Sequence, residues 1–382
     1  MMTEEPMMTG DWRRWLKVFA LLVGLPASLV AEPVDLQVSG TGWLENRRLE
    51  RSLDRLRPDP EAPKLDANGV EDAVFFLFSA LADDGYLKPA VTVELTRPNG
   101  ERLTHTFDAS LTNLLPRPLE AVRVNFQIER GVRYRFGEIT VTGNTGKRSP
   151  EEVRALVLPE ATGFGFGGDY AYSPPALRRG LNRVVDTLAL EGHAQARAEA
   201  PRVTMDDASG EVTISVEVQA GPQSWVDEIV VTGDHPTDLR WPGLDEREQQ
   251  PWSFAWEQDA MEILRHSLYQ RGYPDVRIRS SRVERPGAEG RRLARVTFSI
   301  VTGPRVVVKD VRFAGEHGVK ESVLRRRVRT EPGEPLDPLR FEAARYRLAR
   351  LGAFRRVELD YEPATGPERS PVFTLSPLPL WE

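Results

Sequence analysis

The sequence of 382 residues contains no cysteine. A chain without cysteine has no disulfide framework, no thiolate nucleophile, and no zinc–thiolate or iron–sulfur site. Histidine is scarce too, and no two histidines stand at the spacing of a metal-ligand pair. The five are His105, His193, His235, His266 and His317. We therefore expect no metal, no cofactor and no catalytic residues, and we predict that the protein is not an enzyme.

Basic residues do not outnumber acidic ones. The 51 lysines and arginines against 57 aspartates and glutamates give a net charge of −6 at pH 7. A nucleic-acid-binding chain normally carries a clear basic excess. We therefore expect no nucleic-acid partner.

Long hydrophobic runs are rare, and the one long uncharged run lies near the N-terminus. It covers the 14 residues from Val18 to Ala31 and follows a short basic stretch. A membrane-spanning helix needs about 20 apolar residues, so this run is short for a span and typical of a secretory signal. We predict that residues 1–31 are a signal peptide cleaved after Ala31, with an uncleaved anchor as the alternative.

Three later segments align without a gap. They read GVRYRFGEITVTG at 131–143, GPQSWVDEIVVTG at 221–233 and GPRVVVKDVRFAG at 303–315. Apolar residues alternate within each segment, which is the period of a β-strand, and glycines at both ends suit turns with positive φ. The chain therefore contains a repeated turn and strand.

Stretches of helical period follow, each with one apolar stripe and a glycine at its end. A glycine there suits a left-handed helix cap. Ser173-Pro174, Asp337-Pro338 and the capping box of Ser149 with Glu152 mark helix starts. The glycine ends are Gly85-Tyr86, Gly192-His193, Gly272-Tyr273 and Gly352-Ala353-Phe354.

Each unit then closes with a pair of alternating strands. The pattern predicts an α+β fold, a tandem array of four β-α-α-β-β modules, each a three-stranded mixed sheet with two helices on one face. In the third unit prolines interrupt the first helix, which we expect to be short or absent. The predicted modules cover 33–132, with an insert and an extra hairpin at about 96–120, then 133–222, 223–304 and 305–376.

The repeated turn and strand, together with the glycine-aromatic helix ends, resembles the POTRA domains of the BamA/TamA family of outer-membrane assembly proteins, and the opening from Val34 is similar to TamA. The resemblance covers about residues 33–375. It implies a periplasmic scaffold at the outer membrane, without cofactors, whose partners are nascent outer-membrane proteins or assembly-complex subunits. It also implies a membrane β-barrel, in the same chain or encoded separately, which would begin at the tail 377–382.

Two other functions fit the same modules. One is a stand-alone periplasmic adaptor or chaperone without a barrel, and the other is the POTRA region of a polypeptide-secretion transporter. The resemblance to POTRA domains is compatible with all three functions, so the sequence leaves them open.

A three-stranded sheet with helices on one face has an open edge, and its unpaired N–H and C=O groups can pair with another strand. We expect the strand after each glycine-aromatic end to be this edge. The arginines of the third module could steer an acidic partner, or they could only prevent aggregation. The candidate partner-binding residues are Val276, Arg277, Ile278 and Arg279, with Val357, Leu359 and Tyr361 in the fourth module; Val91–Leu95 and the stretch Ala194–Ala200 are the equivalents in the first two modules.

Two further patterns suggest chemistry but favour structural roles. The segment Gly163–Gly168 matches G-x-G-x-x-G, yet a helix-like stretch precedes it where a dinucleotide site needs a strand. The recurring acidic residues Glu138, Glu228 and Asp310 fall in separate modules, so they cannot share one catalytic cleft. We expect these carboxylates to act beside the turns.

The third and fourth modules carry two other clusters. Of Trp241, Trp252 and Trp256, we expect two in the core and one free to contact a partner. The basic run Arg325–Arg327 is expected to be a solvated helix face, with contact to barrel turns or anionic lipid as the alternative.

Overall fold

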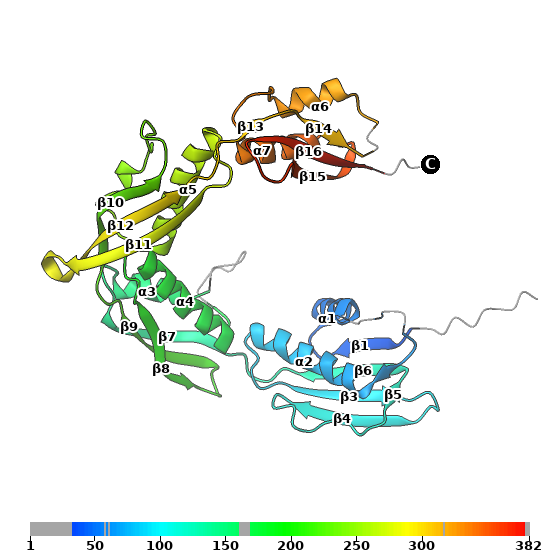
Figure 1. Cartoon of the computed structure of the whole chain (residues 1–382). Coiled ribbons are helices and arrows are strands. Elements are labelled where there is room, and N and C mark those ends of the chain that lie inside the picture. The colour runs from blue at the N-terminus through cyan, green and yellow to red at the C-terminus, as the bar shows by residue number, and fades with distance from the viewer. Residues whose placement is uncertain (1–32, 57–58, 60–61, 160–168, 316–317, 379–382) are drawn as a thin grey trace, which may run out of the picture. The chain divides into compact units, whose positions relative to one another are not determined.

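A computed structural model describes residues 33–56, 59, 62–159, 169–315 and 318–378. Over these residues the chain has the predicted α+β fold, in which four sheets of three or four strands follow one another along the sequence and helices pack beside them (Figure 1). No helix in the described ranges is both long and apolar enough to cross a membrane. The predicted signal peptide, the glycine-rich segment 163–168 and residues 379–382 lie outside the described residues.

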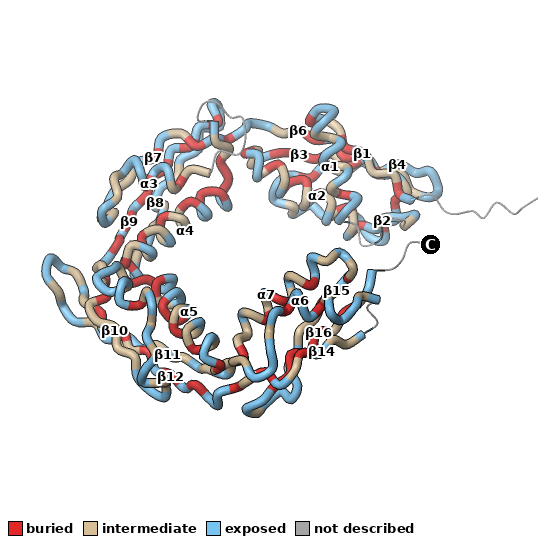
Figure 2. Tube along the Cα trace, turned by 90° about the horizontal axis from the view of Figure 1, so that it is seen from above, coloured by how far each residue is buried: buried red, intermediate tan, exposed pale blue. Residues whose placement is uncertain are grey.

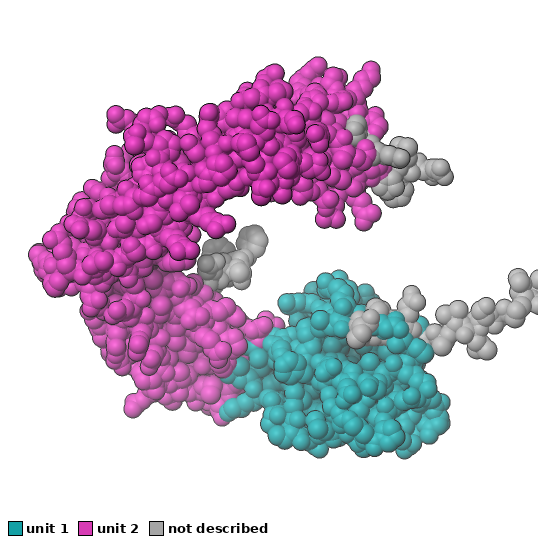
Figure 3. Space-filling model, viewed as in Figure 1, with its two compact units in different colours: residues 1–82, 86–131 teal, residues 83–85, 132–382 magenta. Residues whose placement is uncertain are grey.

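The chain divides into two compact units (Figure 3). The first comprises Met1–Ala82 and Tyr86–Gly131, and the second comprises Asp83–Gly85 and Val132–Glu382. The first unit has a hydrophobic core of its own, built from residues between Val34 and Ile128. The four module boundaries stay a prediction, because this division separates only the first sheet from the other three.

The first sheet has four strands rather than the expected three. Its order is β1 (Asp35–Ser39), β6 (Arg123–Glu129), β3 (Ala90–Thr96) and β4 (Arg102–Asp108), with α1 (Trp43–Leu56) and α2 (Ala67–Asp83) as its helices. A separate two-stranded pair joins β2 (Leu65–Asp66) to β5 (Glu120–Ala121). The extra hairpin is therefore present, as β3 and β4.

This hairpin makes one prediction wrong. Val91–Leu95 lies in β3, which pairs with β6 on one side and with β4 on the other. Val91, Val93 and Leu95 are fully buried. The strand is interior because the insert folds back as β4 and takes the border position.

The second sheet has the order β7, β9, β8, with a parallel pair and an antiparallel pair. Ser149 caps α3 through a capping box with Glu152, and Ser173 caps α4 with Pro174 at its first position, as the sequence predicts. Val212, Val216 and similar residues of the central strand are fully buried. The elements are β7 (Arg135–Asn144), α3 (Pro150–Val157), α4 (Pro174–Leu190), β8 (Arg197–Met205) and β9 (Glu211–Gln219).

The third sheet repeats this order as β10, β12, β11. It has a single α-helix, since only the short 3₁₀ turn η2 (Asp245–Arg247) occupies the place of the first helix, as the prolines predict. Trp252 and Trp256 are buried in its core, and Trp241 packs against that core while partly exposed. The elements are β10 (Ser224–Asp234), α5 (Phe254–Gln270), β11 (Arg277–Pro286), η3 (Ala288–Gly290) and β12 (Arg292–Val301).

In the fourth sheet β16 is central, and β15 pairs with it antiparallel. The parallel border is split into two short strands, which pair with successive parts of β16. Figure 2 shows buried residues concentrated in the sheets and in the adjoining helices. The elements are β13 (Val307–Val308), β14 (Arg312–Ala314), α6 (Glu321–Val328), α7 (Pro338–Ala349), β15 (Phe354–Glu362) and β16 (Glu368–Pro377).

Helix-end glycines also connect successive sheets of the second unit. The N–H of Ser224, at the start of β10, donates to the carbonyl oxygen of Gly192 at 2.9 Å, and that of Val306 donates to Gly272 at 2.7 Å. Both glycines have positive φ, +95° and +86°. The predicted helix caps are thus present, and their carbonyl groups bind the next sheet.

Candidate partner-binding edges

The parallel borders of the last three sheets are covered at their first residues by the chain's own backbone. In each case the covering segment is the one that leads into the main helix, near Tyr170, Gln250 and Glu334. The bonds run from the N–H of Phe136 to the oxygen of Tyr170 (2.9 Å), from Val226 to Gln250 (2.8 Å) and from Val308 to Glu334 (2.9 Å). These groups are unavailable to an added strand.

The opposite borders are formed by β8, β11 and β15, each paired only with the central strand of its sheet. No backbone bond from another described segment reaches the outer side of β11. Arg277, Ile278 and Arg279 lie at the start of this border strand, and Val276 comes directly before it. Val357, Leu359 and Tyr361 lie on β15.

The hydrogen-bond phase of β11 can be deduced from its turn. The N–H of Gly287 donates to the carbonyl oxygen of Arg291 at 2.9 Å, and the register from Pro286 to Arg277 has no shift. Bonding and non-bonding pairs alternate along an antiparallel ladder. The outward backbone groups therefore belong to Ile278, Ser280, Arg282, Glu284 and Pro286. Pro286 presents only its carbonyl group, because proline has no backbone N–H.

Side chains on β11 divide between two faces. Val276 and Ile278 pack against the core of the third sheet, and the Ser280 hydroxyl donates to Glu257 of α5. Arg277 and Arg279 are exposed on the other face. At the start of β11, an added strand would thus meet Val276 and Ile278 on one face and the guanidinium groups of Arg277 and Arg279 on the other.

The β15 border differs in charge. Val357 is buried, and Leu359 and Tyr361 are partly buried in the core of the fourth sheet, where burial raises the pKa of Tyr361. Glu358, Asp360 and Glu362 alternate with them. Its pairing is irregular between Phe354 and Arg356 and regular from there on.

The β8 border is poorly suited to strand addition. Its ladder shifts register between Glu199 and Arg202, and Pro201 lies within this irregularity. A bulge and a proline both interrupt pairing with a further strand. The strand also begins only at Arg197, so the first part of the predicted stretch from Ala194 precedes it.

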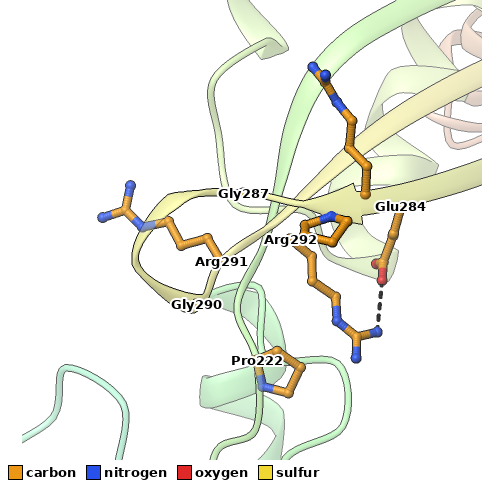
Figure 4. Close-up of a pocket in the computed structure, with 8 residues that line it drawn as sticks. Pro222, Glu284, Gly287, Gly290, Arg291 and Arg292 are labelled. Atoms are coloured by element: carbon orange, nitrogen blue, oxygen red, sulfur yellow. Dashed lines mark hydrogen bonds and ion pairs between the residues drawn. The ribbon is translucent and has the colours of Figure 1, made fainter.

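A hollow of about 450 Å³ lies at the turn end of the β11–β12 hairpin, beside Pro222 (Figure 4). Arg292 reaches Glu284 at 3.1 Å, whereas Arg291 points away from that carboxylate. Burial by itself would raise the pKa of Glu284, but hydrogen bonds from Ser224 and Arg292 and nearby guanidinium charge outweigh it and lower the pKa. Glu284 is thus held as a charged anchor of the hairpin.

The other sequence patterns are dispersed. Glu138 and Glu228 lie at irregularities in β7 and β10, and Asp310 lies between β13 and β14, so the three carboxylates occupy separate sheets. Glu228 pairs with Arg295 at 2.5 Å. Within the described ranges, no group of three or more histidine, aspartate or glutamate side chains is placed to hold a metal ion.

The basic run on α6 is exposed, and Arg325 pairs with Glu321 and Asp310. Contact with lipid or barrel turns stays a prediction. Sequence reasoning missed two contacts: the glycine carbonyl groups that bind the next sheet, and the pairing of Asp275 with Arg369. The sequence signal for the glycine contacts is a constant spacing: the residue whose N–H donates to the glycine follows the end of the preceding central strand by the same number of residues each time.

Comparison with known proteins identifies part of the chain. Residues 306–374 match the POTRA family model, described as surface antigen variable number repeat. This segment holds α6, α7 and the fourth sheet except for the last three residues of β16.

Solved structures show more distant similarity over longer stretches. POTRA domains 3–5 of BamA from Haemophilus influenzae are 19% identical, with 64% of this chain and 96% of that chain covered and a TM-score of 0.42. POTRA domains 1–3 of the periplasmic domain of Omp85 from Anabaena are 16% identical, with 64% and 96% covered and a TM-score of 0.26. CdiB from Escherichia coli is 19% identical, with 54% and 34% covered and a TM-score of 0.22. Because these scores are low, the assignment rests on the family model alone, which assigns residues 306–374 to the POTRA family.

Proposed function

Since the chain carries a POTRA domain, we propose that it is a periplasmic scaffold for the assembly or secretion of outer-membrane proteins. It binds extended segments of clients or partner subunits by strand addition at the open borders β11 and β15. The uncovered outer side of β11 is the observation that carries this proposal. The predicted signal peptide at 1–31 supports the periplasmic location.

The energetics favour weak and transient binding of an added strand. Ile278, Ser280, Arg282 and Glu284 each offer one N–H and one C=O to an added strand. Each hydrogen bond contributes a net of about 0.5–1.5 kcal/mol, against an association cost of roughly 4–15 kcal/mol. Binding through the backbone alone is therefore weak and reversible, which suits a protein that passes clients onward.

Proline substitution on β11 tests strand addition. Ser280→Pro removes an outward N–H and leaves the ladder to β12 intact, so we expect an extended peptide to bind at least about tenfold more weakly, since lost bonds and ring clashes add up. Binding is followed by titration of residues 33–382 and by protection of the Ile278 and Arg282 amides from hydrogen exchange.

Two variants control this experiment. Ser280→Ala also loses the hydroxyl bond to Glu257 but keeps the N–H, so it should bind like the parent. Ser281→Pro removes an N–H that faces β12 and should destabilise the sheet instead. Unchanged binding by a folded Ser280→Pro variant would show that β11 does not accept strands.

A further inference from the structure

Two guanidinium groups on the open face of the third sheet have no acidic partner. Arg285 pairs with Asp227, and Arg295 pairs with Glu228 at 2.5 Å. Arg277 and Arg279, by contrast, are exposed and make no ion pair with any described residue. Their cross-strand neighbours on β12 are Val301 and Ser299. The positive charge at this end of β11 is therefore not neutralised within the sheet.

The phase of β11 places these two arginines where a partner's side chains come closest. Outward backbone bonds are made by Ile278 and Ser280, so Arg277 and Arg279 fall in the non-hydrogen-bonded pairs of an added antiparallel strand. In such pairs the Cα atoms are only about 4.5 Å apart and opposite charges attract directly. Carboxylates two residues apart on the partner would face both guanidinium groups at once.

The β15 border carries carboxylates along its second half. Glu358, Asp360 and Glu362 alternate along β15. Glu358 pairs with Arg356 at 2.5 Å and Glu362 with Arg312 at 3.1 Å, whereas Asp360 is exposed and makes no ion pair with a described residue. A segment with carboxylates on alternate residues would meet like charge there.

We propose that the β11 border selects acidic extended segments, those with carboxylates at positions i and i+2 on one face and apolar residues on the other, through Arg277 and Arg279. This inference rests on the proposed strand addition and names the class of segment that is taken. The segment's apolar residues lie beside Val276 and Ile278, and its carboxylates lie opposite the two arginines. The β15 border does not take such a segment.

Two synthetic peptides test the selection. They share the same alternating apolar residues and carry either glutamate or lysine at the intervening positions. We expect the glutamate peptide to bind residues 33–382 at β11 at least about fivefold more tightly, from two cross-strand pairs that attract in one case and repel in the other. This preference should shrink between about 0.05 M and about 0.5 M salt, because exposed charges are screened.

Charge reversal provides the decisive comparison. In the double variant Arg277→Glu/Arg279→Glu the preference at β11 should invert, and the lysine peptide should bind more tightly. As a matched control, Asp360→Lys changes the other border and should leave the β11 preference unchanged. Protection of the Ile278 and Arg282 amides from hydrogen exchange shows that the peptide is bound at β11.

The outcomes separate this inference from the proposed function. If the two peptides protect the β11 amides equally, both in the parent protein and in the double variant, strand addition stands and the charge selection is wrong. If neither peptide protects these amides and Ser280→Pro has no effect, strand addition itself is wrong and the selection falls with it. Inversion of the preference in the double variant supports both.

Discussion

Single glycines at helix ends have two tasks in this protein. Gly192 and Gly272 adopt positive φ, which ends α4 and α5, and their carbonyl oxygens accept the N–H of Ser224 and Val306. A Cβ at Gly272 would lie 2.7 Å from the carbonyl oxygen of Val306. The first task follows from sequence because it is local, whereas the second depends on where the next sheet lies.

The substitution Gly272→Ala separates the two tasks. We expect it to lower the free energy of unfolding by about 1–3 kcal/mol, since a non-glycine residue at positive φ is strained and the new Cβ meets backbone. Gly352→Ala is the control, because φ there is +70° but nothing lies within 4 Å of the added Cβ. Urea unfolding of both variants measures the difference, and equal losses would show that the contact with Val306 is unimportant.

Among the elements, the border strands decide what a partner can reach. The parallel borders β7, β10 and β13 are covered at their first residues, and β8 is interrupted at Pro201. In the first sheet, apolar and polar residues alternate along β3 as they do along a border strand, but β4 pairs with its outer side. Alternation reveals which side chains face the core, and it does not reveal whether another strand lies alongside.

The β11–β12 hairpin should contribute acid sensitivity through Glu284. The pKa of Glu284 is lowered from its ordinary value of 4.5 in the folded protein. Its stabilising effect is therefore present above that ordinary value and is lost as the pH falls through the lowered folded pKa. We expect Glu284→Gln to be less stable than the parent near neutral pH, and the difference in stability to narrow at an acidic pH well below 4.5.

Urea midpoints at both pH values measure this gap. The control is Glu289→Gln at the tip of the same hairpin, where the side chain is 80% exposed. It should match the parent at both pH values. A gap for Glu284→Gln that does not change with pH would contradict an electrostatic role.

At the scale of the whole molecule, the second unit is a series of sheets connected by recurring contacts. Each later sheet begins with a residue whose N–H donates to the preceding helix-end glycine, and the same bond links Tyr134 to Gly85, both within this unit. Arg369 of β16, only 5% exposed, also donates to Asp275 with both terminal guanidinium nitrogens. These contacts should couple the unfolding of the third and fourth sheets.

Removal of one charge tests this coupling. Asp275→Asn leaves the buried guanidinium of Arg369 without a carboxylate, and we expect it to lower stability by about 1–3 kcal/mol and to broaden the calorimetric transition of the second unit. Glu362→Gln is the control, since its pair with Arg312 is exposed and contributes about 0–1 kcal/mol. Equal effects of the two variants would argue against coupling through Asp275.

The amino-acid sequence alone predicts the repeated elements, the helix caps at Ser149 and Ser173, and the α+β class. These features depend on residues close together in the chain, through alternation, capping side chains and glycines at positive φ. They could therefore be predicted without knowledge of how the elements pair.

Which sheet borders are open depends on how the strands pair in the folded protein. Backbone pairing joins residues far apart in the chain, so nothing local distinguished interior β3 from border β11, or revealed that Asp275 meets Arg369. The lack of acidic partners for Arg277 and Arg279 also became visible only once the neighbouring strands were in place, because a side chain on a strand can pair with residues of the next strand that are far away in the chain.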